Sequence, residues 1–147
     1  MKYYTGLLAL SQYADSSEDS VGLGSQSYEF LSHKDDFIAD TDESVLGTRG
    51  VMETITIPSN EVIMCANHTR AYCDMLIQHK FETLKGLYEE ALRTYSSFYK
   101  VFKMARSAGL YDDKEILQFM NKEYGSYFRS FLMKYGEDDL LSQIMED

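Results

Sequence analysis

Residues 51–68 read VMETITIPSNEVIMCANH and contain two different hydrophobic patterns. In the first part, apolar residues alternate with polar ones, which is the two-residue period of a half-buried β-strand. A Pro-Ser-Asn turn and a second apolar run follow, so we predict a β-hairpin over residues 51–65. Asn67 comes next; it is a favoured N-cap residue and predicts the start of a helix.

Downstream of this junction the apolar residues repeat at helical spacing. One helix is predicted over residues 68–79, another begins near Asp112 and bends near Gly125, and a short acidic helix covers 137–146. The longest apolar stripe lies between the first two and forms either one helix or two helices divided at residues 96–97. Its members are Leu84, Tyr88, Ala91, Tyr95, Phe98, Phe102 and Ala105.

The N-terminal part of the chain has shorter patterns. Residues 2–10 predict a strand whose leucines enter a core, and residues 11–27 are rich in Ser, Asp and Gly and predict an acidic loop. The whole pattern predicts an α+β fold, in which a small antiparallel sheet from the N-terminal half packs against a helical C-terminal half. Because the sequence contains neither an internal repeat nor a linker, we expect residues 1–147 to form a single domain.

The formal net charge is −10, and the acidic residues are unevenly distributed. Residues 1–63 contain eleven acidic and three basic side chains, whereas residues 64–147 contain thirteen acidic and eleven basic ones. A field of this sign repels nucleic acid and anionic membranes and favours a basic protein surface; solubility alone is the alternative explanation. We therefore expect a basic protein partner, without direct nucleic-acid binding or membrane association.

The compartment is predicted from three further properties of the sequence. Residues 7–10 are too short a run for the apolar core of a signal peptide, and no apolar run approaches the length of a membrane span. The two cysteines do not resemble a disulfide framework. These properties together predict a cytoplasmic protein.

Acidic residues gather in two places, at 15–19 and at 35–43. Carboxylates beside an exposed Phe or Ile suit an interface with a basic protein, whereas an ordinary polar loop has the same composition. The candidate partner-binding residues are Asp15, Glu18, Asp19, Asp35, Asp36, Asp40, Asp42 and Glu43.

The densest group of reactive side chains, Cys65, His68 and Cys73, surrounds the predicted helix start. Thiolate and imidazole are zinc ligands, and a Cys–His pair can supply a nucleophile and a base. Neither a fourth metal ligand nor a third catalytic group is evident, so we predict no metal, no cofactor and no enzymatic activity. An alternative site is a ligand-binding patch of His68, Arg70 and Asp74, although Arg70 and Asp74 are most simply a helix-surface ion pair.

Two further features belong to the long helical stripe. Its heptad-like step leaves open a structural homodimer formed through paired helices. Lys100, Lys103 and Arg106 form a modest basic patch, without the alternation of basic and aromatic residues that is typical of binding to single-stranded nucleic acid.

Three short motifs carry a resemblance to other proteins. They are Gly6-Leu7-Leu8-Ala9-Leu10, then Ala66-Asn67-His68-Thr69-Arg70-Ala71 with Asp74-Met75-Leu76, and Phe119-Met120-Asn121-Lys122-Glu123-Tyr124. In these motifs the sequence resembles a group of small uncharacterised proteins from Gram-positive bacteria, their phages and other mobile elements. The resemblance implies no activity, but it implies an accessory-gene setting in which inhibitors, antitoxins and anti-defence proteins are common.

These observations together predict an acidic protein-binding factor. It would inhibit a basic, nucleic-acid-handling partner, either as an antitoxin-like protein or as a phage anti-defence protein of the anti-CRISPR type. A ligand- or metal-binding protein and a structural oligomer are the alternatives.

Overall fold

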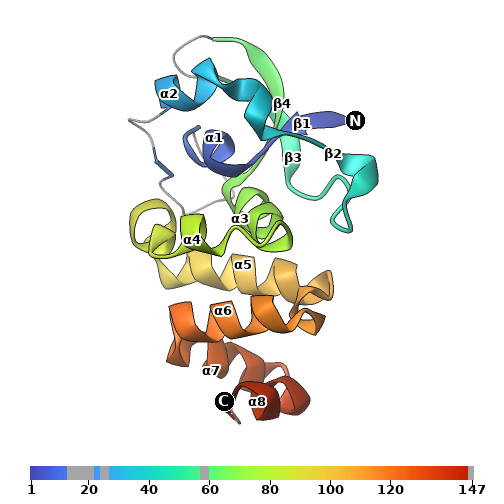
Figure 1. The fold of residues 1–147 in the computed structure, drawn as a ribbon, viewed down its shortest axis with the longest axis vertical. Coiled ribbons are helices and arrows are strands. Elements are labelled where there is room, and N and C mark those ends of the chain that lie inside the picture. Colours follow the sequence, from blue (N-terminus) through green and yellow to red (C-terminus); the bar gives the residue numbers. More distant parts are fainter. Residues whose placement is uncertain (13–21, 24–26, 57–59, 146–147) are drawn as a thin grey trace.

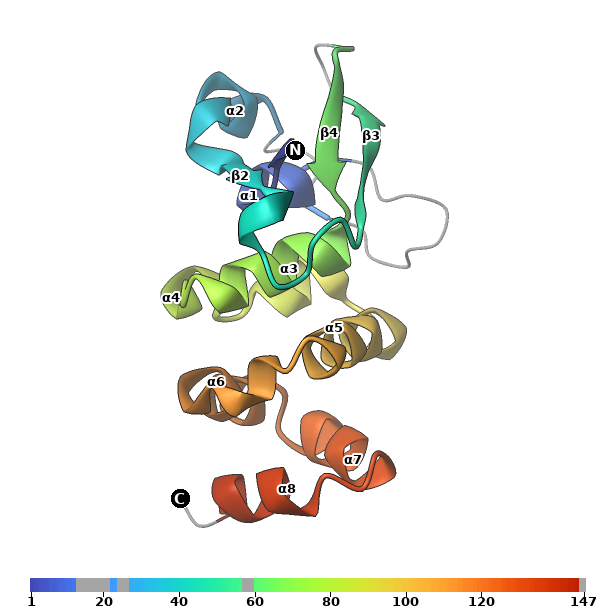
Figure 2. The same ribbon diagram turned by 90° about the vertical axis from the view of Figure 1, so that its right-hand side faces the viewer.

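A four-stranded sheet lies at one end of the molecule, and helices are stacked in layers towards the other end (Figure 1). The computed structural model describes residues 1–12, 22–23, 27–56 and 60–145. Helix α3 (His68–Ile77) lies beneath the sheet and above the helices formed by residues 95–145 (Figure 2). The chain therefore has an α+β fold, with the sheet in the N-terminal half and most helices in the C-terminal half.

The sheet has the strand order β2-β1-β4-β3. Its last two strands form the hairpin predicted from the sequence, with an antiparallel register that runs from Val51 opposite Ala66 to Ile55 opposite Val62. The central pair, β1 and β4, is parallel, so the sheet contains one parallel pairing among its antiparallel ones. The strands are β1 (Lys2–Tyr4), β2 (Ile38–Asp40), β3 (Val51–Ile55) and β4 (Val62–Ala66).

The strand predicted over residues 2–10 is wrong beyond Tyr4. Gly6 has a φ of +65°, which turns the chain out of the sheet and into helix α1 (Gly6–Leu10). Leu8 and Leu10 do enter the core, but from a helix. A side chain at residue 6 would be strained by this backbone conformation, and its Cβ would lie 3.3 Å from the ring of Phe37.

Short elements connect α1 to the hairpin. They are helix α2 (Ser27–Ser32) and two 3₁₀ turns, η2 (Lys34–Phe37) and η3 (Thr41–Glu43), which flank strand β2. Residues 13–21 and 24–26, which make up most of the predicted acidic loop, lie outside the described residues.

Helix α3 begins where the sequence predicts it. The Asn67 side-chain oxygen accepts a hydrogen bond of 2.8 Å from the backbone N–H of Arg70. Gly50, the residue before β3, lies against this cap with a φ of +69°, and a Cβ there would come within 2.8 Å of Asn67 Oδ1 and Arg70 Cβ. A glycine is therefore required for the chain to pass so close to the helix start.

The long apolar stripe is divided, as one of the two alternatives predicted. It spans helix α4 (Phe81–Leu84), the π-helical turn η4 (Tyr88–Leu92) and helix α5 (Tyr95–Ser107). The break is at Arg93, whose φ is +64°, and the cap of α5 is Thr94, which accepts from the N–H of Ser97 at 3.2 Å. The cap thus precedes the two serines that the sequence suggested.

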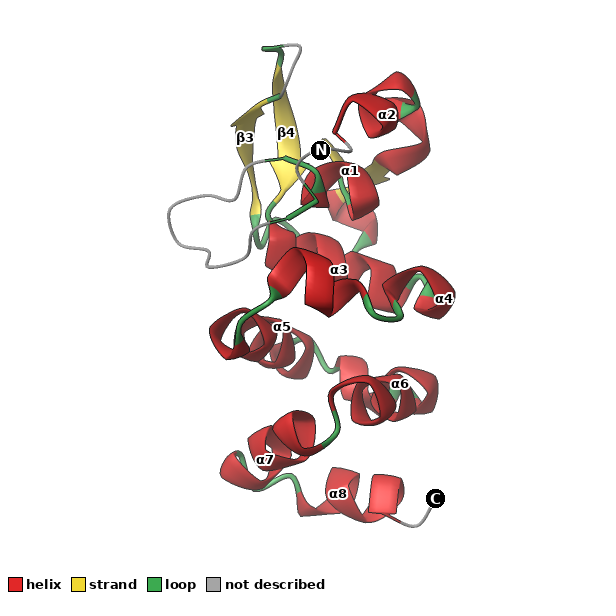
Figure 3. Cartoon of the chain, turned by 90° about the vertical axis from the view of Figure 1, so that its left-hand side faces the viewer, coloured by secondary structure: helices red, strands yellow, loops and turns green. Residues whose placement is uncertain are grey.

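The last part of the chain forms three helices joined by short turns (Figure 3). Asp113 caps the first of them, one residue later than the predicted Asp112. Gly125, with a φ of +56°, separates the first two, so the predicted bend is a complete break. The helices are α6 (Lys114–Tyr124), α7 (Ser126–Lys134) and α8 (Asp138–Met145), preceded by the 3₁₀ turn η5 (Leu110–Asp112).

Aromatic rings fill the interior of the helical half. Phe102, on α5, has its ring centroid 4.9 Å from that of Tyr124 and 5.4 Å from those of Phe128 and Phe131. Most of the apolar stripe is therefore buried within the chain itself. None of the helices in the described part of the chain combines the length and the apolar content that a membrane span requires.

Candidate functional site

Arg70 and Asp74 form an ion pair in the interior of the protein. Arg70 Nε lies 2.8 Å from Asp74 Oδ1, and the two side chains are 0% and 6% exposed. The sequence-based interpretation of a helix-surface pair is therefore wrong, because the face of α3 that carries both residues is covered by the sheet and by the segment before β3.

The remaining N–H groups of Arg70 are also used inside the protein. One terminal nitrogen donates to the backbone carbonyls of Gly47, at 2.8 Å, and Arg49, at 2.6 Å. The other donates to the hydroxyl of Tyr3 at 2.9 Å. The guanidinium thus ties helix α3 to strand β1 and to the chain that leads into β3.

The second oxygen of Asp74 accepts two hydrogen bonds from the N-terminal part of the chain. The Tyr3 hydroxyl donates at 2.6 Å and the Thr5 hydroxyl at 2.7 Å. Burial, followed by the hydrogen bond to Asp74, raises the pKa of Tyr3, so its hydroxyl keeps its proton and acts as the donor. Buried ions are tolerated when they are paired and hydrogen-bonded in this way, and losing one partner is costly.

His68 lies apart from this network, although all three residues are on α3. Its Nε2 is 2.9 Å from the backbone carbonyl of Gln12, and a Cβ at Gly22 would lie 2.7 Å from its ring. The His68 side chain is buried, as are Arg70 and Asp74. The structure therefore does not gather His68, Arg70 and Asp74 into one patch open to a small ligand.

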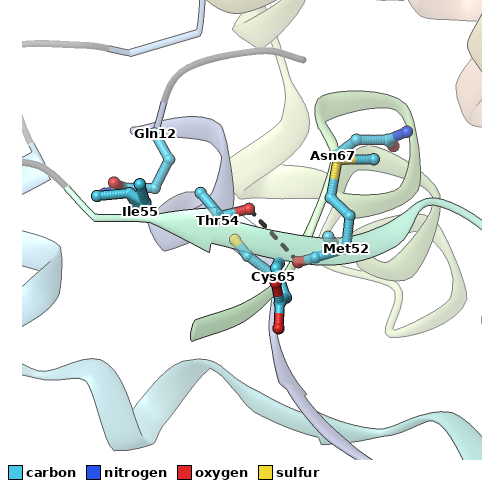
Figure 4. A pocket seen from close by; sticks show the side chains of 8 residues that line it. Gln12, Met52, Thr54, Ile55, Cys65 and Asn67 are labelled. Carbon is cyan, nitrogen blue, oxygen red and sulfur yellow. Dashed lines mark hydrogen bonds between the residues drawn. The ribbon is translucent and has the colours of Figure 1, made fainter. Parts of the chain in front are cut away.

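The cysteines lie in surroundings that disfavour the thiolate. Burial raises the pKa of Cys65 to about 12 and raises that of Cys73 as well. Cys65 lines a pocket of about 340 Å³ on the face of the β3–β4 hairpin, together with Met52, Thr54 and Gln12 (Figure 4). No cluster of three metal-ligating side chains occurs among the described residues. Nucleophilic chemistry needs a thiolate, so this pocket offers none at neutral pH.

The candidate partner-binding carboxylates fall into three groups. Asp35 and Asp36 on η2, with Asp42 and Glu43 on η3, are exposed. Asp40 is only 21% exposed in its side chain. The candidates Asp15, Glu18 and Asp19 lie outside the described residues.

Asp40 has a structural role that sets it apart from its neighbours. Its Oδ1 accepts from the backbone N–H of Asp42 at 3.0 Å and from the terminal ammonium of Met1 at 3.0 Å, and Lys2 Nζ is 3.7 Å from its Oδ2. These contacts, the bond from Asp42 first, lower the pKa of Asp40. Asp40 thus holds η3 against β1, and its charge is partly neutralised within the protein.

A groove of about 490 Å³ lies between strand β2, the turn η3 and the C-terminal end of α3. Its apolar side chains are unusually accessible, with Ile38 42%, Val45 66% and Ile77 38% exposed. Asp40, Glu43 and Asp74 also line the groove, and neither Lys nor Arg does so in the described part of the chain. The Asp74 carboxylate is paired with the buried Arg70 and the Asp40 carboxylate with the Met1 ammonium, so Glu43 contributes the exposed charge. We call this surface the acidic groove; it is defined by Ile38, Asp40, Glu43, Val45, Asp74 and Ile77.

The acidic groove contains only some of the residues that the sequence suggested. Asp40 and Glu43 come from the candidate partner-binding set and Asp74 from the candidate ligand patch. Val45 and Ile77 were not singled out, because an isolated valine in a loop and an isoleucine in a helical apolar pattern give no sequence signal of exposure. Their exposure depends on where η3 and the end of α3 lie in the folded chain.

Comparison of the chain with protein-family models, with curated proteins and with solved structures finds no match.

Proposed function

We propose that this protein is an acidic binding factor that inhibits a basic, nucleic-acid-handling protein, as an antitoxin-like or phage anti-defence factor does. The observation that carries the proposal is the acidic groove, in which exposed apolar side chains lie beside the exposed carboxylate of Glu43 without a Lys or Arg lining residue in the described chain. Such a surface is complementary to Arg and Lys side chains, because its apolar residues suit their aliphatic stems and its negative charge suits their charged heads.

The chemistry of an arginine or lysine from the partner explains why both kinds of residue are needed. Its aliphatic stem would pack on Ile38, Val45 and Ile77, and its charged head would reach the carboxylate of Glu43. Asp35, Asp36 and Asp42, exposed nearby on η2 and η3, extend the negative surface beyond the groove. A protein that binds there covers a basic surface that would otherwise bind nucleic acid, and inhibition follows from that competition.

The proposal is tested with the partner captured from the native host and identified by mass spectrometry. The test variant carries Asp35→Lys, Asp36→Lys, Asp42→Lys and Glu43→Lys, and leaves the structural Asp40 unchanged. We expect its affinity for the partner to fall at least tenfold at low salt, and its inhibition of nucleic-acid binding by the partner to fall in parallel. The affinity of the wild-type protein should decrease steeply as salt increases, because exposed charges are screened.

A matched variant controls for net charge alone. Glu82→Lys, Glu89→Lys, Glu90→Lys and Asp139→Lys make the same change in charge at exposed positions in the helical half. We expect this control to bind within a few-fold of wild type. If the groove-side variant bound as tightly as wild type, or if both variants lost affinity equally, the acidic surface would not be the site of recognition.

A further inference from the structure

Helices α5 and α7 differ in charge from the rest of this acidic protein. α5 reads YSSFYKVFKMARS and α7 reads SYFRSFLMK, so together they carry five basic side chains and no acidic one. The whole chain has 24 acidic against 14 basic residues. Two adjacent helices free of acidic residues therefore form a local positive surface, and α5 and α7 are in contact through their rings.

Four tyrosines run in a row along the seam between these two helices. The ring centroids of Tyr127 and Tyr95 are 5.6 Å apart, those of Tyr95 and Tyr99 are 5.9 Å apart, and those of Tyr99 and Tyr135 are 6.5 Å apart. Tyr95 and Tyr127 are 46% and 53% exposed, so solvent reaches both of these rings. Rings that remain exposed contribute little to packing of the core. An exposed tyrosine ring is, however, suited to stacking on a nucleic-acid base.

Basic side chains converge on the other end of the row. Lys134 Nζ lies 5.0 Å and Lys103 Nζ 5.6 Å from the ring centroid of Tyr99. Among the described residues neither lysine forms an ion pair, whereas Arg106, over Tyr135, is paired with Glu137 at 2.8 Å. Two ammonium groups thus meet at one ring without a described carboxylate, which leaves their charge available to an anion.

The hydroxyls at this end of the row are hydrogen-bonded to each other. Those of Tyr99 and Tyr135 are 3.1 Å apart. The hydrogen bond with Lys134, and then that with Tyr135, lower the pKa of Tyr99, so its O–H is a stronger donor than that of an ordinary tyrosine. A phosphate near Lys103 and Lys134 would therefore meet both ammonium groups and a polarised phenol.

From this arrangement we propose that the α5–α7 tyrosine surface binds single-stranded nucleic acid. Phosphates lie at Lys103 and Lys134, and bases stack on the exposed rings of Tyr95 and Tyr127. Stacking platforms beside a positive track are the usual means of binding single strands without sequence preference. The exposed rings favour this ligand over an acidic peptide, which needs the charges but not the rings.

The inference is independent of the function proposed for the acidic groove, and it revises the expectation of no direct nucleic-acid contact. That expectation depended on the overall charge and on the order of residues along one helix. The four tyrosines and the two lysines come together only after α5 and α7 pack side by side. The acidic groove is lined by residues of β2, which lies at the sheet end above α3 (Figure 1), and by the end of α3 itself. Charges separated by more than the Debye length, about 8 Å at physiological salt, interact weakly.

The test is a titration of a fluorescein-labelled oligothymidylate of about a dozen nucleotides, followed by fluorescence anisotropy at about 50 mM and about 200 mM salt. For Lys103→Gln with Lys134→Gln we expect binding at least tenfold weaker and a salt dependence reduced by a slope of about 1.4, as expected for two lost phosphate contacts. For Tyr95→Ala with Tyr127→Ala we expect at least tenfold weaker binding with an unchanged salt dependence. All four side chains are exposed, and Lys103 and Lys134 also contact the ring of Tyr99, so thermal unfolding checks that each variant is folded.

Lys80→Gln with Lys114→Gln, two exposed lysines on other elements, removes the same charge and is expected to bind as wild type does. The groove-side charge reversal of the preceding section should not weaken binding, so failure of either proposal is recognised separately. Absence of binding by wild type at about 50 mM salt, or equal losses in the control lysine variant, would overturn the inference. The inference would also be overturned if the lysine variant lost self-association in sedimentation velocity but kept its affinity for the oligonucleotide. The α5–α7 tyrosine surface would then bind the acidic surface of a second copy of the chain.

Discussion

The sheet-bearing half and the helical half of the molecule both pack on α3, but they are joined to it by different contacts. On the sheet side, the Arg70–Asp74 ion pair is hydrogen-bonded to Tyr3 and Thr5 in the interior. On the helical side, the aromatic rings of Tyr124, Phe128 and Phe131 pack around that of Phe102, and these contacts are mostly apolar. An ionic network depends on each of its members, whereas an aromatic core loses stability in proportion to the volume removed. The two halves should therefore respond differently to single substitutions.

The largest expected effect is that of Arg70→Ala. It leaves the carboxylate of Asp74 buried without its cation, and it leaves the carbonyls of Gly47 and Arg49 without their donor. Removing one partner of a buried pair costs about 3–5 kcal/mol, a large part of the stability of a domain of this size. Urea unfolding followed by circular dichroism measures the change.

The matched control is Arg106→Ala, which removes a more exposed ion pair with Glu137. Pairs of this kind contribute about 0–1 kcal/mol. Equal losses of unfolding free energy in the Arg70 and Arg106 variants would contradict the description of Arg70–Asp74 as a buried pair whose members depend on each other.

An intermediate effect is expected for Tyr124→Phe. The Tyr124 hydroxyl donates to that of Tyr72 at 2.8 Å and so links α6 to α3 inside the protein. Leaving the buried Tyr72 hydroxyl without this partner costs about 1–3 kcal/mol. Adding Tyr72→Phe removes both polar groups and should restore most of the loss, as measured by urea unfolding of the single and double variants. A double variant less stable than either single one would show that the hydroxyls act through other contacts.

The smallest expected effect concerns pH. His79 Nε2 lies 2.6 Å from Asp113 Oδ2, and its Nδ1 lies 3.1 Å from Glu115 Oε2, so the charged imidazole joins the end of α3 to the start of α6. The hydrogen bond to Asp113 raises the pKa of His79 above its usual 6.5. The stabilisation is complete below the unfolded-state pKa and is lost as pH rises through the folded-state pKa.

We therefore expect His79→Gln to lower the melting temperature more at a pH of about 5.5 than at about 8.5, because only the lower value leaves the imidazole charged in both states. Differential scanning calorimetry of both proteins at the two pH values measures this difference. A loss of equal size at both pH values would assign the effect to packing on Phe81, whose ring stacks on that of His79, and not to charge.

The parts of the fold that could be predicted from the sequence are those determined by near neighbours. The hairpin follows from alternation and a turn within residues 51–65, and the cap at Asn67 follows from one side chain and the N–H three residues later. Gly6 explains the failure of the predicted strand, because a positive φ at a single residue redirects a chain whose leucines fit either a strand or a helix.

The surfaces to which we assign the proposed functions could be predicted only in part, since each combines residues from separate elements. Sequence distance hides the burial of Arg70, whose partner Tyr3 is 67 positions away. It also hides the acidic groove, where Val45 and Ile77 become exposed neighbours of Glu43 only in the folded chain. Exposure is easier to predict for the carboxylates of Asp35, Asp36, Asp42 and Glu43, because charged side chains favour the surface wherever they occur in the chain.

The buried network of Arg70 and Asp74 also constrains the order in which the protein can fold during synthesis. Tyr3 and Asp74 are 71 positions apart, and ribosomes add about 5–20 residues per second, so β1 waits about 4–14 s for the helix that secures it. Until then an unfinished sheet is exposed on the ribosome. Residues 1–63 contain eleven acidic side chains, so the incompletely folded N-terminal segments of neighbouring nascent chains repel one another. Repulsion of this kind opposes aggregation of unfinished chains, independently of any partner that the folded protein binds.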